Sequence, residues 1–362
     1  MMTLKASLIC FVGPLPPPVH GFSEINKRML AVLRSRHEVS AFDMTPSDNS
    51  LGFLLVWWRF VLGVLRNKPN ALYLAFSGGL RQWVDLLFVL VARWKGVSIY
   101  IHHHSFSYVS QEHRSKLMQL GVMRNAVHIV LCEYMGKEIV RLYRVDPNKI
   151  RVLSNAAFLE EIVAPDRAGS VSKPLRLGFL SNITDEKGIF EFFSVLSESG
   201  SHGLSLQGLI AGPVDTSVKV NFDRSLASNP NVKHVGPVYG ADKAAFFASV
   251  DVLLFPTRYP NEAQPVTILE ALGHGVPVIA FARGCIESMV PDGAGVVFPY
   301  SETFVTQTIA ALRPLAESSV ALEKARHAAR LAFESQRASN RGALEILVAE
   351  IGISLDKKQV PA

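Results

Sequence analysis

Short apolar runs that end in Gly, Pro or polar residues alternate with longer segments of helical period along the first half of the chain. Short apolar runs suit the buried strands of a parallel sheet, and longer amphipathic segments suit the helices that cover it. The pattern predicts helices at residues 22–35 and 83–94 among others, and strands at residues 7–12, 38–42, 71–76, 98–102, 128–131 and 150–153. We therefore expect an α/β domain over residues 1–160.

A second alternating series follows a polar stretch, residues 161–174, which has no apolar period and is interpreted as an interdomain linker. The series predicts strands at residues 175–180, 205–210, 232–235, 252–255, 276–280 and 295–297, with helices at 188–199, 243–250, 266–274 and from 304 onward. We expect a second domain over residues 175–335. The rest, 336–362, is expected to be a terminal helix that either closes the second domain or crosses back to the first.

Composition supports two folded domains and narrows the partners. A length of 362 residues is long for one hydrophobic core, and 49% hydrophobic with 19% charged residues is typical of a folded chain. A net charge of +6 suits an anionic partner, such as a nucleoside diphosphate or an acidic lipid surface. The chain has no long Lys/Arg tract and no zinc-type Cys/His spacing, so we expect neither nucleic acid nor a metal as its partner.

The most informative segment, residues 261–280, reads NEAQPVTILEALGHGVPVIA and follows a predicted strand. Pro265 suits the first turn of a helix, and Gly273 and Gly275 suit its end before the next buried strand. The start of such a helix offers unpaired N–H groups and a partial positive charge, which can bind a diphosphate.

Two glutamates in this segment, Glu262 and Glu270, lie eight positions apart, on the order of 10 Å if the chain between them is largely helical. That separation suits the two ends of a nucleotide sugar. A carboxylate accepts hydrogen bonds in pairs, so one glutamate can hold ribose hydroxyls and the other hexose hydroxyls. A pair of solvated glutamates is the alternative.

The whole string resembles the Glu-x7-Glu motif of retaining glycosyltransferases of family 4 (glycosyl transferases group 1), with the form Glu-Gly-Phe-x-x-x-x-x-Glu-Ala-x-x-x-Gly-x-Pro-Val-Ile-Ala. Ala263 and Gln264 replace Gly-Phe here. The resemblance implies a GT-B fold: two Rossmann-like domains with parallel sheets facing a central cleft, the donor mostly on the second domain. It makes Glu262 a catalytic and donor-binding residue, and Ala263, Gln264, Val266 and Glu270 donor-binding residues.

A second motif, residues 181–188 (SNITDEKG), is similar to the family's Gly-Arg-Leu-x-x-x-Lys-Gly, in which Arg and Lys neutralise the donor diphosphate. Lys187 matches the lysine, which implies a catalytic and donor-binding role, whereas a solvated lysine is the alternative. Asn182 stands at the arginine position, so the expected donor contact there lacks the positive charge.

Residues 13–21 (GPLPPPVHG) lie where the family has a glycine-rich loop beside the donor phosphate and the acceptor. The resemblance implies a donor contact for Gly21 and an acceptor-side place for His20, with a tight turn as the alternative. Ser77 and Gly78 follow another first-domain strand and are also expected on the acceptor side, where an ordinary turn is an equal alternative.

Three successive histidines end the strand predicted at residues 98–102, where the family places a histidine near the transferred sugar. Adjacent residues of a strand point to opposite faces, so the three cannot share one role and make a poor metal cage. We take His103 and His104 as catalytic candidates and His102 as an acceptor-side candidate. The sequence leaves the choice among them open.

The resemblance implies transfer of a sugar from a nucleoside-diphosphate donor of UDP or GDP type to an acceptor hydroxyl, with retention and without a cofactor. The expected acceptor is a glycan or a lipid-linked sugar in cell-envelope polysaccharide or glycolipid assembly. No cleavage pattern follows the apolar start, so we expect a cytoplasmic protein, with a peripheral place on the inner face of the membrane as a variant.

Two apolar stretches, residues 51–65 and 83–94, bear on that variant. The first holds Trp57, Trp58 and Arg59 and is too short to span a bilayer. Together they could lay a basic, aromatic face on an anionic membrane, or they could be buried core helices.

Three alternatives to a glycosyltransferase stay open. One is a sugar-nucleotide epimerase or hydrolase of the same fold, and the second is a non-catalytic two-lobed sugar-binding protein. The third, a nicotinamide oxidoreductase, is disfavoured because no Gly-x-Gly-x-x-Gly follows either first strand.

Overall fold

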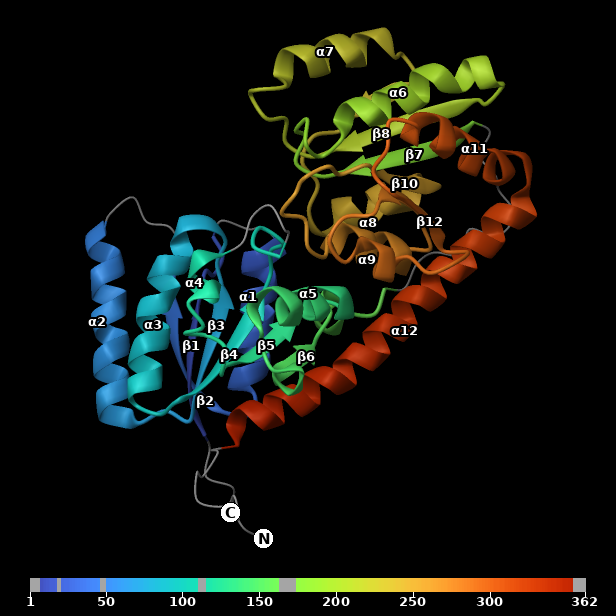
Figure 1. Cartoon of the computed structure of the whole chain (residues 1–362). Helices are drawn as coiled ribbons and strands as arrows, with labels where there is room; N and C mark the ends of the chain where they lie inside the picture. The colour runs from blue at the N-terminus through green and yellow to red at the C-terminus, as the bar shows by residue number, and fades with distance from the viewer. Residues whose placement is uncertain (1–6, 18–20, 46–49, 110–114, 163–173, 354–362) are drawn as a thin grey trace. The chain divides into compact units, whose positions relative to one another are not determined.

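The computed structural model describes residues 7–17, 21–45, 50–109, 115–162 and 174–353 (Figure 1). The chain divides into two compact units. Unit 1 comprises Met1–Leu159 with Ala338–Ala362, and unit 2 comprises Glu160–Arg337. The expected cleft between the domains stays a prediction.

Unit 1 is built on a six-stranded parallel sheet of order β2-β1-β3-β4-β5-β6. Its strands are β1 (Leu8–Gly13), β2 (Glu38–Asp43), β3 (Ala71–Phe76), β4 (Ser98–His103), β5 (Val127–Val130) and β6 (Ile150–Val152). Its helices are α1 (Gly21–Arg34), α2 (Ser50–Asn67), α3 (Gln82–Trp94), α4 (Lys116–Gln119) and α5 (Glu133–Tyr143). The predicted strands are confirmed, with ends that differ by at most one residue.

Unit 2 holds a second six-stranded parallel sheet, of order β12-β11-β10-β7-β8-β9. Its strands are β7 (Leu175–Leu180), β8 (Leu206–Ala211), β9 (Val232–His234), β10 (Val252–Phe255), β11 (Val278–Phe281) and β12 (Gly295–Phe298). Its helices are α6 (Ile189–Ser199), α7 (Lys219–Ser228), α8 (Gly240–Ser249), α9 (Val266–Gly273), α10 (Ile286–Met289) and α11 (Phe304–Glu317).

Strand β11 shows why one predicted boundary is wrong. The sequence placed its start at residue 276, but Val276 donates its N–H back to Ala271, at the end of α9. Pro277 has no N–H for the ladder, although its carbonyl accepts from Leu253 on β10. The strand therefore begins at Val278.

The core of unit 2 explains the apolar runs of its strands. Leu177, Phe179, Ile210, Val252 and Leu254 are at most 2% exposed and pack in one cluster with side chains of α6 and α11. A strand of a helix-covered sheet is buried on both faces, so its sequence is continuously apolar rather than alternating.

The last helix, α12 (Ser319–Gly352), contributes to both units. Leu322, Ala329 and Phe333 are buried on its first part, in unit 2, and Val348 and Ile351 on its last part, in unit 1. The periodic apolar residues thus bury a stripe along the helix. Throughout the described residues, each helix is too short or too polar to cross a membrane.

Candidate donor and acceptor sites

The strand order of unit 2 creates a place for a ligand. The first strand, β7, has β8 on one side and β10 on the other, so the chain reverses its winding between β7 and β10. In open parallel sheets the loops at the carboxyl ends of two such strands diverge and leave room for ligands. Residues 181–188 follow β7 and residues 256–265 follow β10. Both predicted donor motifs therefore begin at this point.

The two motifs meet through Lys187 and Glu262. Lys187 Nζ lies 2.5 Å from Glu262 Oε2, and their side chains are 19% and 11% exposed. Thr257 Oγ1 donates to the same carboxylate oxygen at 3.2 Å. Lys187 Nζ also lies 4.7 Å from the ring centroid of Tyr259, a cation–π distance. The ion pair is thus partly shielded from water. A partly buried charged pair interacts more strongly than one at an open surface.

Two glycines allow this close approach of loops. Gly188 has φ +81°, and a Cβ there would lie 2.1 Å from the carbonyl oxygen of Pro256. Gly284 has φ +55°, and its Cβ would lie 2.2 Å from the carbonyl oxygen of Glu262. A side chain at either position would force the loops apart.

Glu270 lies in α9 and has its own lysine. Lys243 Nζ, from α8, lies 2.8 Å from Glu270 Oε1 and 2.7 Å from Oε2, with the two side chains 31% and 19% exposed. Lys243 carries no signal in the sequence, because a partner on a separate helix is brought close to Glu270 only by the fold.

The start of α9 is open at its first turn. Pro265 precedes the helix in extended conformation and gives it no side-chain cap. Ala263 and Gln264 are 5% and 7% exposed, and Val266 is partly buried. The Ala263 carbonyl accepts from the N–H of Cys285, which fixes the loop before the helix.

Two arginines that the sequence analysis missed lie around this loop. Arg258 Nη2 lies 2.9 Å from Asp185 Oδ2, and its Nη1 lies 3.1 Å from Glu191 Oε1. Arg283 lies 5.2 Å from the ring centroid of Tyr300, and its Nε is buried without a hydrogen-bond partner in the described part of the chain. Asn182, at the family's arginine position, is exposed.

In unit 1 the winding reverses between β1 and β3. Gly13 ends β1 against β3, where its Cβ would lie 2.7 Å from that of Ala75. Ser77 and Gly78 follow β3, and the Ser77 N–H donates to Asp85 Oδ2 at 2.8 Å. Gly21 is exposed at the start of α1, whereas His20 lies outside the described residues.

The three histidines divide between two faces of β4, as strand geometry requires. His103 is fully buried, with Nδ1 2.9 Å from Tyr108 Oη and Nε2 2.9 Å from His128 Nδ1. His128 Nε2 lies 3.1 Å from the Met123 carbonyl, so it carries the proton. His103 Nε2 then donates to His128, and Tyr108 donates to His103. Both ring nitrogens of His103 therefore take part in hydrogen bonds, one with Tyr108 and one with His128.

His102 and His104 share the other face, with ring centroids 4.0 Å apart. His102 Nδ1 lies 2.5 Å from Tyr73 Oη, and the His104 ring lies 4.7 Å from that of Phe22 near the start of α1. The Nε2 atoms of both histidines are buried and have no hydrogen-bond partner among the described residues.

Burial sets the protonation of this region. Desolvation lowers the pKa of His104 to about 3 and of His128 to about 4, and holds the pKa of His102 and of His103 well below the usual range. All four rings are therefore neutral near pH 7. Burial also raises the pKa of Asp85 to about 7, against the opposing hydrogen bonds from Ser77.

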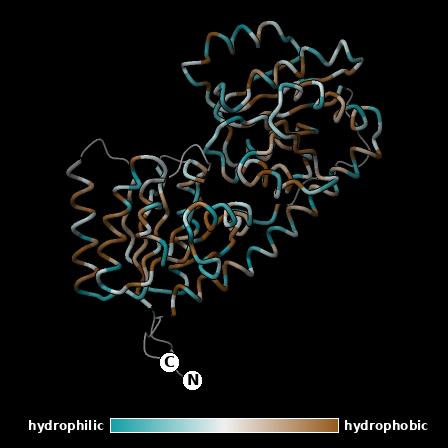
Figure 2. Tube along the Cα trace, in the orientation of Figure 1, coloured by the Kyte–Doolittle hydropathy of each residue, from teal (hydrophilic) through white to brown (hydrophobic). Residues whose placement is uncertain are grey.

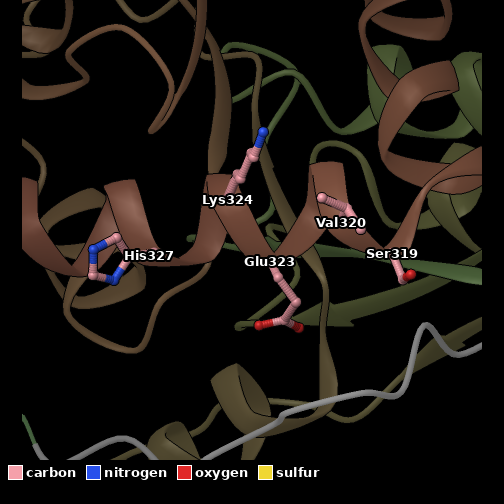
Figure 3. Close-up of a pocket in the computed structure, with 5 residues that line it drawn as sticks. All are labelled: Ser319, Val320, Glu323, Lys324 and His327. Carbon is pink, nitrogen blue, oxygen red and sulfur yellow. The ribbon is translucent and has the colours of Figure 1, made fainter.

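A surface depression on α12 is separate from these residues. It is lined by Ser319, Val320, Glu323, Lys324 and His327 (Figure 3), none of which belongs to the predicted donor or acceptor sets. Within the described ranges, no three His, Cys, Asp or Glu side chains gather as a metal-binding group.

Comparisons with known proteins agree with this architecture. Residues 174–314 match the family model described as "Glycosyl transferases group 1". A sequence search among curated proteins gives no match. The Anabaena protein Alr3699/HepE in complex with UDP-glucose has a similar structure, with a TM-score of 0.73 and 14% identity over 95% of this chain and 100% of that one.

Two further structures are similar. The lipopolysaccharide outer core galactosyltransferase WaaB has a TM-score of 0.69 and 15% identity, over 94% of this chain and 99% of that one. A glycosyltransferase from Rickettsia africae has a TM-score of 0.69 and 15% identity, over 99% of this chain and all of that one. The chain therefore has the GT-B fold, as predicted.

Proposed function

We propose that the protein is a retaining glycosyltransferase of family 4 that moves a sugar from a UDP- or GDP-type donor to an acceptor hydroxyl. The family match over residues 174–314 and the GT-B fold support a glycosyltransferase. The observation that carries the proposal is the contact of Lys187 with Glu262 where the winding of the unit 2 sheet reverses. That contact joins a cation suited to phosphate and a carboxylate suited to sugar hydroxyls.

In this proposal the donor spans the two glutamates. Lys187 binds the diphosphate, Glu262 accepts hydrogen bonds from the sugar hydroxyls, and Glu270 accepts them from the ribose. The open N–H groups at the start of α9, next to Ala263, Gln264 and Val266, face the same anionic group. Asn182 contributes a neutral contact only.

Each glutamate pairs with a lysine, Glu262 with Lys187 and Glu270 with Lys243. Donor binding then exchanges these partners: phosphate draws Lys187, and the ribose hydroxyls share Glu270 with Lys243. The two ion pairs hold both carboxylates in place beside the proposed donor site.

On the acceptor side, His104 is a better candidate than His103 for contact with the transferred sugar. Both nitrogens of His103 are engaged with Tyr108 and His128, whereas His104 Nε2 has no partner within the described residues. A neutral His104 offers a hydrogen bond rather than a charge. We assign His102, His20, Gly21, Ser77 and Gly78 to the surroundings of the acceptor and of the donor phosphate.

The proposed reaction is a front-face displacement. The bond between the anomeric carbon and the leaving phosphate oxygen breaks, and the acceptor oxygen forms its bond on the same face. The acceptor proton passes to the departing phosphate, whose negative charge Lys187 stabilises. No resident cofactor or metal has a part in these steps. An inverted product anomer would exclude this mechanism.

The wider role follows from the acceptor. We propose a glycan or lipid-linked acceptor in cell-envelope polysaccharide or glycolipid assembly, on the cytoplasmic side of the membrane, in peripheral contact with it. Similarity to a lipopolysaccharide core galactosyltransferase supports this direction.

The first test is a thermal-shift screen of the wild type and Glu270→Ala against UDP-, GDP-, ADP- and dTDP-sugars, with slow donor hydrolysis as a second readout. We expect one nucleotide class to raise Tm in the wild type and the Glu270 variant to lose most of that rise. Glu287→Ala, which removes an exposed glutamate of the same unit, is the matched control and should keep it.

The same screen separates the alternatives. Sugar release or epimerisation that no acceptor can redirect would favour an epimerase or hydrolase. Tight binding of free sugars without turnover would favour a binding protein. Equal stabilisation of the wild type and the Glu270 variant would reject the proposed donor site.

A further inference from the structure

Helix α2 has an apolar face on its outer side. Leu54, Leu55, Trp58, Leu62 and Leu65 are between 39% and 65% exposed. Leu55, Trp58, Leu62 and Leu65 follow a spacing of three, four and three residues, and Leu54 lies four residues before Trp58, which places the five on one side of the helix. The opposite side is buried through Phe60 and Val64, so α2 is apolar on both sides.

Helix α3 repeats this arrangement. Trp83, Leu87, Leu90 and Trp94 also follow a spacing of four, three and four residues, and are between 37% and 71% exposed. Its inner side is buried through Phe88, Val89 and Ala92, which pack toward the sheet of unit 1.

The two helices lie side by side in unit 1 (Figure 1). Phe88 of α3 contacts both Phe60 and Phe53 of α2, at ring centroid distances of 4.9 and 6.4 Å. Figure 2 shows the strongly hydrophobic colour along both helices. We define the α2–α3 face as the exposed apolar residues of α2 and α3 together with Leu80, which precedes α3: Leu54, Leu55, Trp58, Leu62, Leu65, Leu80, Trp83, Leu87, Leu90 and Trp94. An exposed apolar patch of this extent on a folded protein marks a docking surface.

The exposed charges on the described residues of α2 and at the end of α3 have one sign. Arg59 and Arg66 lie exposed on α2, and Arg93 and Lys95 lie exposed at the end of α3. Lys95 Nζ sits 4.0 Å from the ring centroid of Trp94. The acidic residue of these two helices, Asp85, is only 3% exposed. The surface therefore combines Leu and Trp side chains with a basic border.

We propose that the α2–α3 face docks on an anionic lipid bilayer surface. Tryptophan rings favour the level of the lipid headgroups, leucines enter the acyl boundary, and arginine and lysine pair with lipid phosphates. A second copy of the chain fits less well, because a two-fold interface would set this basic border against itself. The exposed side chains project from two neighbouring helices, which suits their insertion into a lipid bilayer surface.

The docking proposal stands apart from the proposed enzyme activity, since it uses none of the donor or acceptor residues. One consequence does rest on that activity: a protein held on the bilayer by unit 1 takes its acceptor from the bilayer, as a lipid-linked sugar.

The test is sedimentation of the full chain with vesicles of phosphatidylcholine alone or with added phosphatidylglycerol, at low and high salt. The variants are Leu55→Glu/Trp58→Glu on α2, Trp83→Glu/Leu90→Glu on α3, and Arg59→Ala/Arg66→Ala on the border. The control is Leu120→Glu, which changes an equally exposed leucine of unit 1 outside the face. Thermal shift with the preferred nucleotide sugar shows that each variant is folded.

We expect the wild type to bind the anionic vesicles and to release them at high salt. Each Glu double variant should bind about tenfold or more weakly, and the arginine pair about tenfold more weakly at low salt. The Leu120 control should bind as the wild type does. The nucleotide response should be unchanged in all variants, so failure to dock is distinct from failure of the enzyme proposal.

Three results would overturn the proposal. They are no binding of the wild type to anionic vesicles at low salt, equal loss in the Leu120 control, and a wild-type dimer that the Glu variants turn into monomers. The last would make the face an interface between two copies.

Discussion

At the scale of single residues, the donor loops are held by contacts that only short distances and specific residue types allow. Lys187 and Glu262 come from loops after two adjacent strands, and their 2.5 Å contact ties these loops together. Gly188 lets the first loop pass against Pro256 at the base of the second. The same pair that would bind the donor also holds its binding loops in place.

Replacing Lys187 tests whether this lysine has a specific role in catalysis beyond its contribution to the net charge. We expect Lys187→Met to lower kcat/KM about 100- to 1,000-fold, because the leaving phosphate loses its cation in the transition state. Lys219→Met is the control, since Lys219 forms an ion pair with Asp223 that is about half exposed. Steady-state transfer assays on both variants check this, and equal losses would exclude a specific role for Lys187.

The conformation of Gly188 gives a second prediction. Gly188→Ala should lower the stability of unit 2 by about 1–3 kcal/mol and weaken donor binding, because its Cβ would meet Pro256 and its φ is positive. Gly200→Ala, at φ −62° with nothing near its Cβ, should leave both unchanged. Denaturant unfolding and donor titration measure the two effects. A Gly188 variant that unfolds and binds as the wild type does would mean that the loops can separate freely.

Asp85 makes the stability of unit 1 depend on pH. Its pKa is about 7 in the folded state and close to 3.8 when unfolded, so the folded state holds an extra proton between these values. The free energy of unfolding due to Asp85 therefore falls as pH rises through this window, by about 1.4 kcal/mol per pH unit at most. Above pH 7 this contribution is lost.

Asp85→Asn should remove that dependence, since an amide cannot ionise. Between pH 5 and pH 8 the unfolding free energy of the wild type should therefore fall relative to that of the variant. The buried histidines act oppositely, because their lowered pKa values stabilise the folded state above about pH 6.5 and destabilise it in acid. They are present in both proteins and cancel in the difference. A difference that does not change with pH would mean that Asp85 stays ionised in the folded state.

Sequence reasoning reached these residues unevenly. The motif strings located Lys187, Glu262 and Glu270, because register within a motif is written in the sequence. Lys243, Arg258 and Arg283 carry no such signal, since their relation to the glutamates depends on how helices and loops pack. The choice of a catalytic candidate among the three histidines could be narrowed only from the structure. The structure shows that both ring nitrogens of His103 are hydrogen-bonded, to Tyr108 and His128.

At the scale of elements, strands were predictable and some helices were not. Buried parallel strands are continuous apolar runs, so β3, β7 and β10 match their predicted bounds in full. Helices α5 and α7 were not named, and α7 buries only Phe222 among its residues. A helix with so little buried surface leaves a weak periodic signal in the sequence.

Helix α12 is anchored in unit 2 by a buried ion pair. Arg326 is 1% exposed, and its Nη2 lies 2.7 Å from Asp251 Oδ1, which is fully buried. Asp251 Oδ2 also accepts from the backbone N–H of Arg176, the second residue of β7, at 2.9 Å. The pair therefore connects the helix to the sheet.

Removing one partner should be costly. We expect Arg326→Met to destabilise unit 2 by up to about 3–5 kcal/mol, because the fully buried Asp251 carboxylate would keep only Arg176, at 3.4 Å and partly exposed, as its cation. Arg313→Met breaks an exposed pair with Glu317 on α11 and should change stability by less than about 1 kcal/mol. Chemical denaturation with a unit 2 probe tests the contrast. A small effect at Arg326 would show that Arg176 or water takes its place beside Asp251.

At the scale of the whole molecule, each unit has its own sheet and core, yet unit 1 is not continuous in sequence. Its first 159 residues are completed by the chain after Arg337. Glu350 pairs with Arg151 at 2.8 Å, and the Ser154 N–H donates to Asn340 Oδ1 at 2.8 Å. His37 Nε2 lies 3.0 Å from the Val348 carbonyl. These contacts join both ends of the unit 1 sequence.

The apolar side of the same segment carries most of its stabilising contribution. Leu344, Leu347, Val348 and Ile351 are at most 6% exposed. Burying each such side chain contributes roughly 1.5–3 kcal/mol, more than the partly exposed ion pair of Arg151 and Glu350. Unit 1 should therefore depend on the end of α12 chiefly through these apolar contacts.

Truncation tests this dependence. A chain that ends at Arg337 should lose several kcal/mol of stability in unit 1, while unit 2 keeps its buried Arg326–Asp251 pair and its stability. Hydrogen exchange read separately for peptides of β1, β3 and β4 and for peptides of β7 and β10 measures the two units in one experiment. A chain that ends at Ile353 is the control, because it keeps every contact named above. If hydrogen exchange in unit 1 is the same in both truncated chains, the first 159 residues fold unaided and unit 1 does not need the end of α12 for its stability. Faster exchange confined to unit 1 in the chain that ends at Arg337 would mean that the fold of unit 1 is completed only by the end of α12.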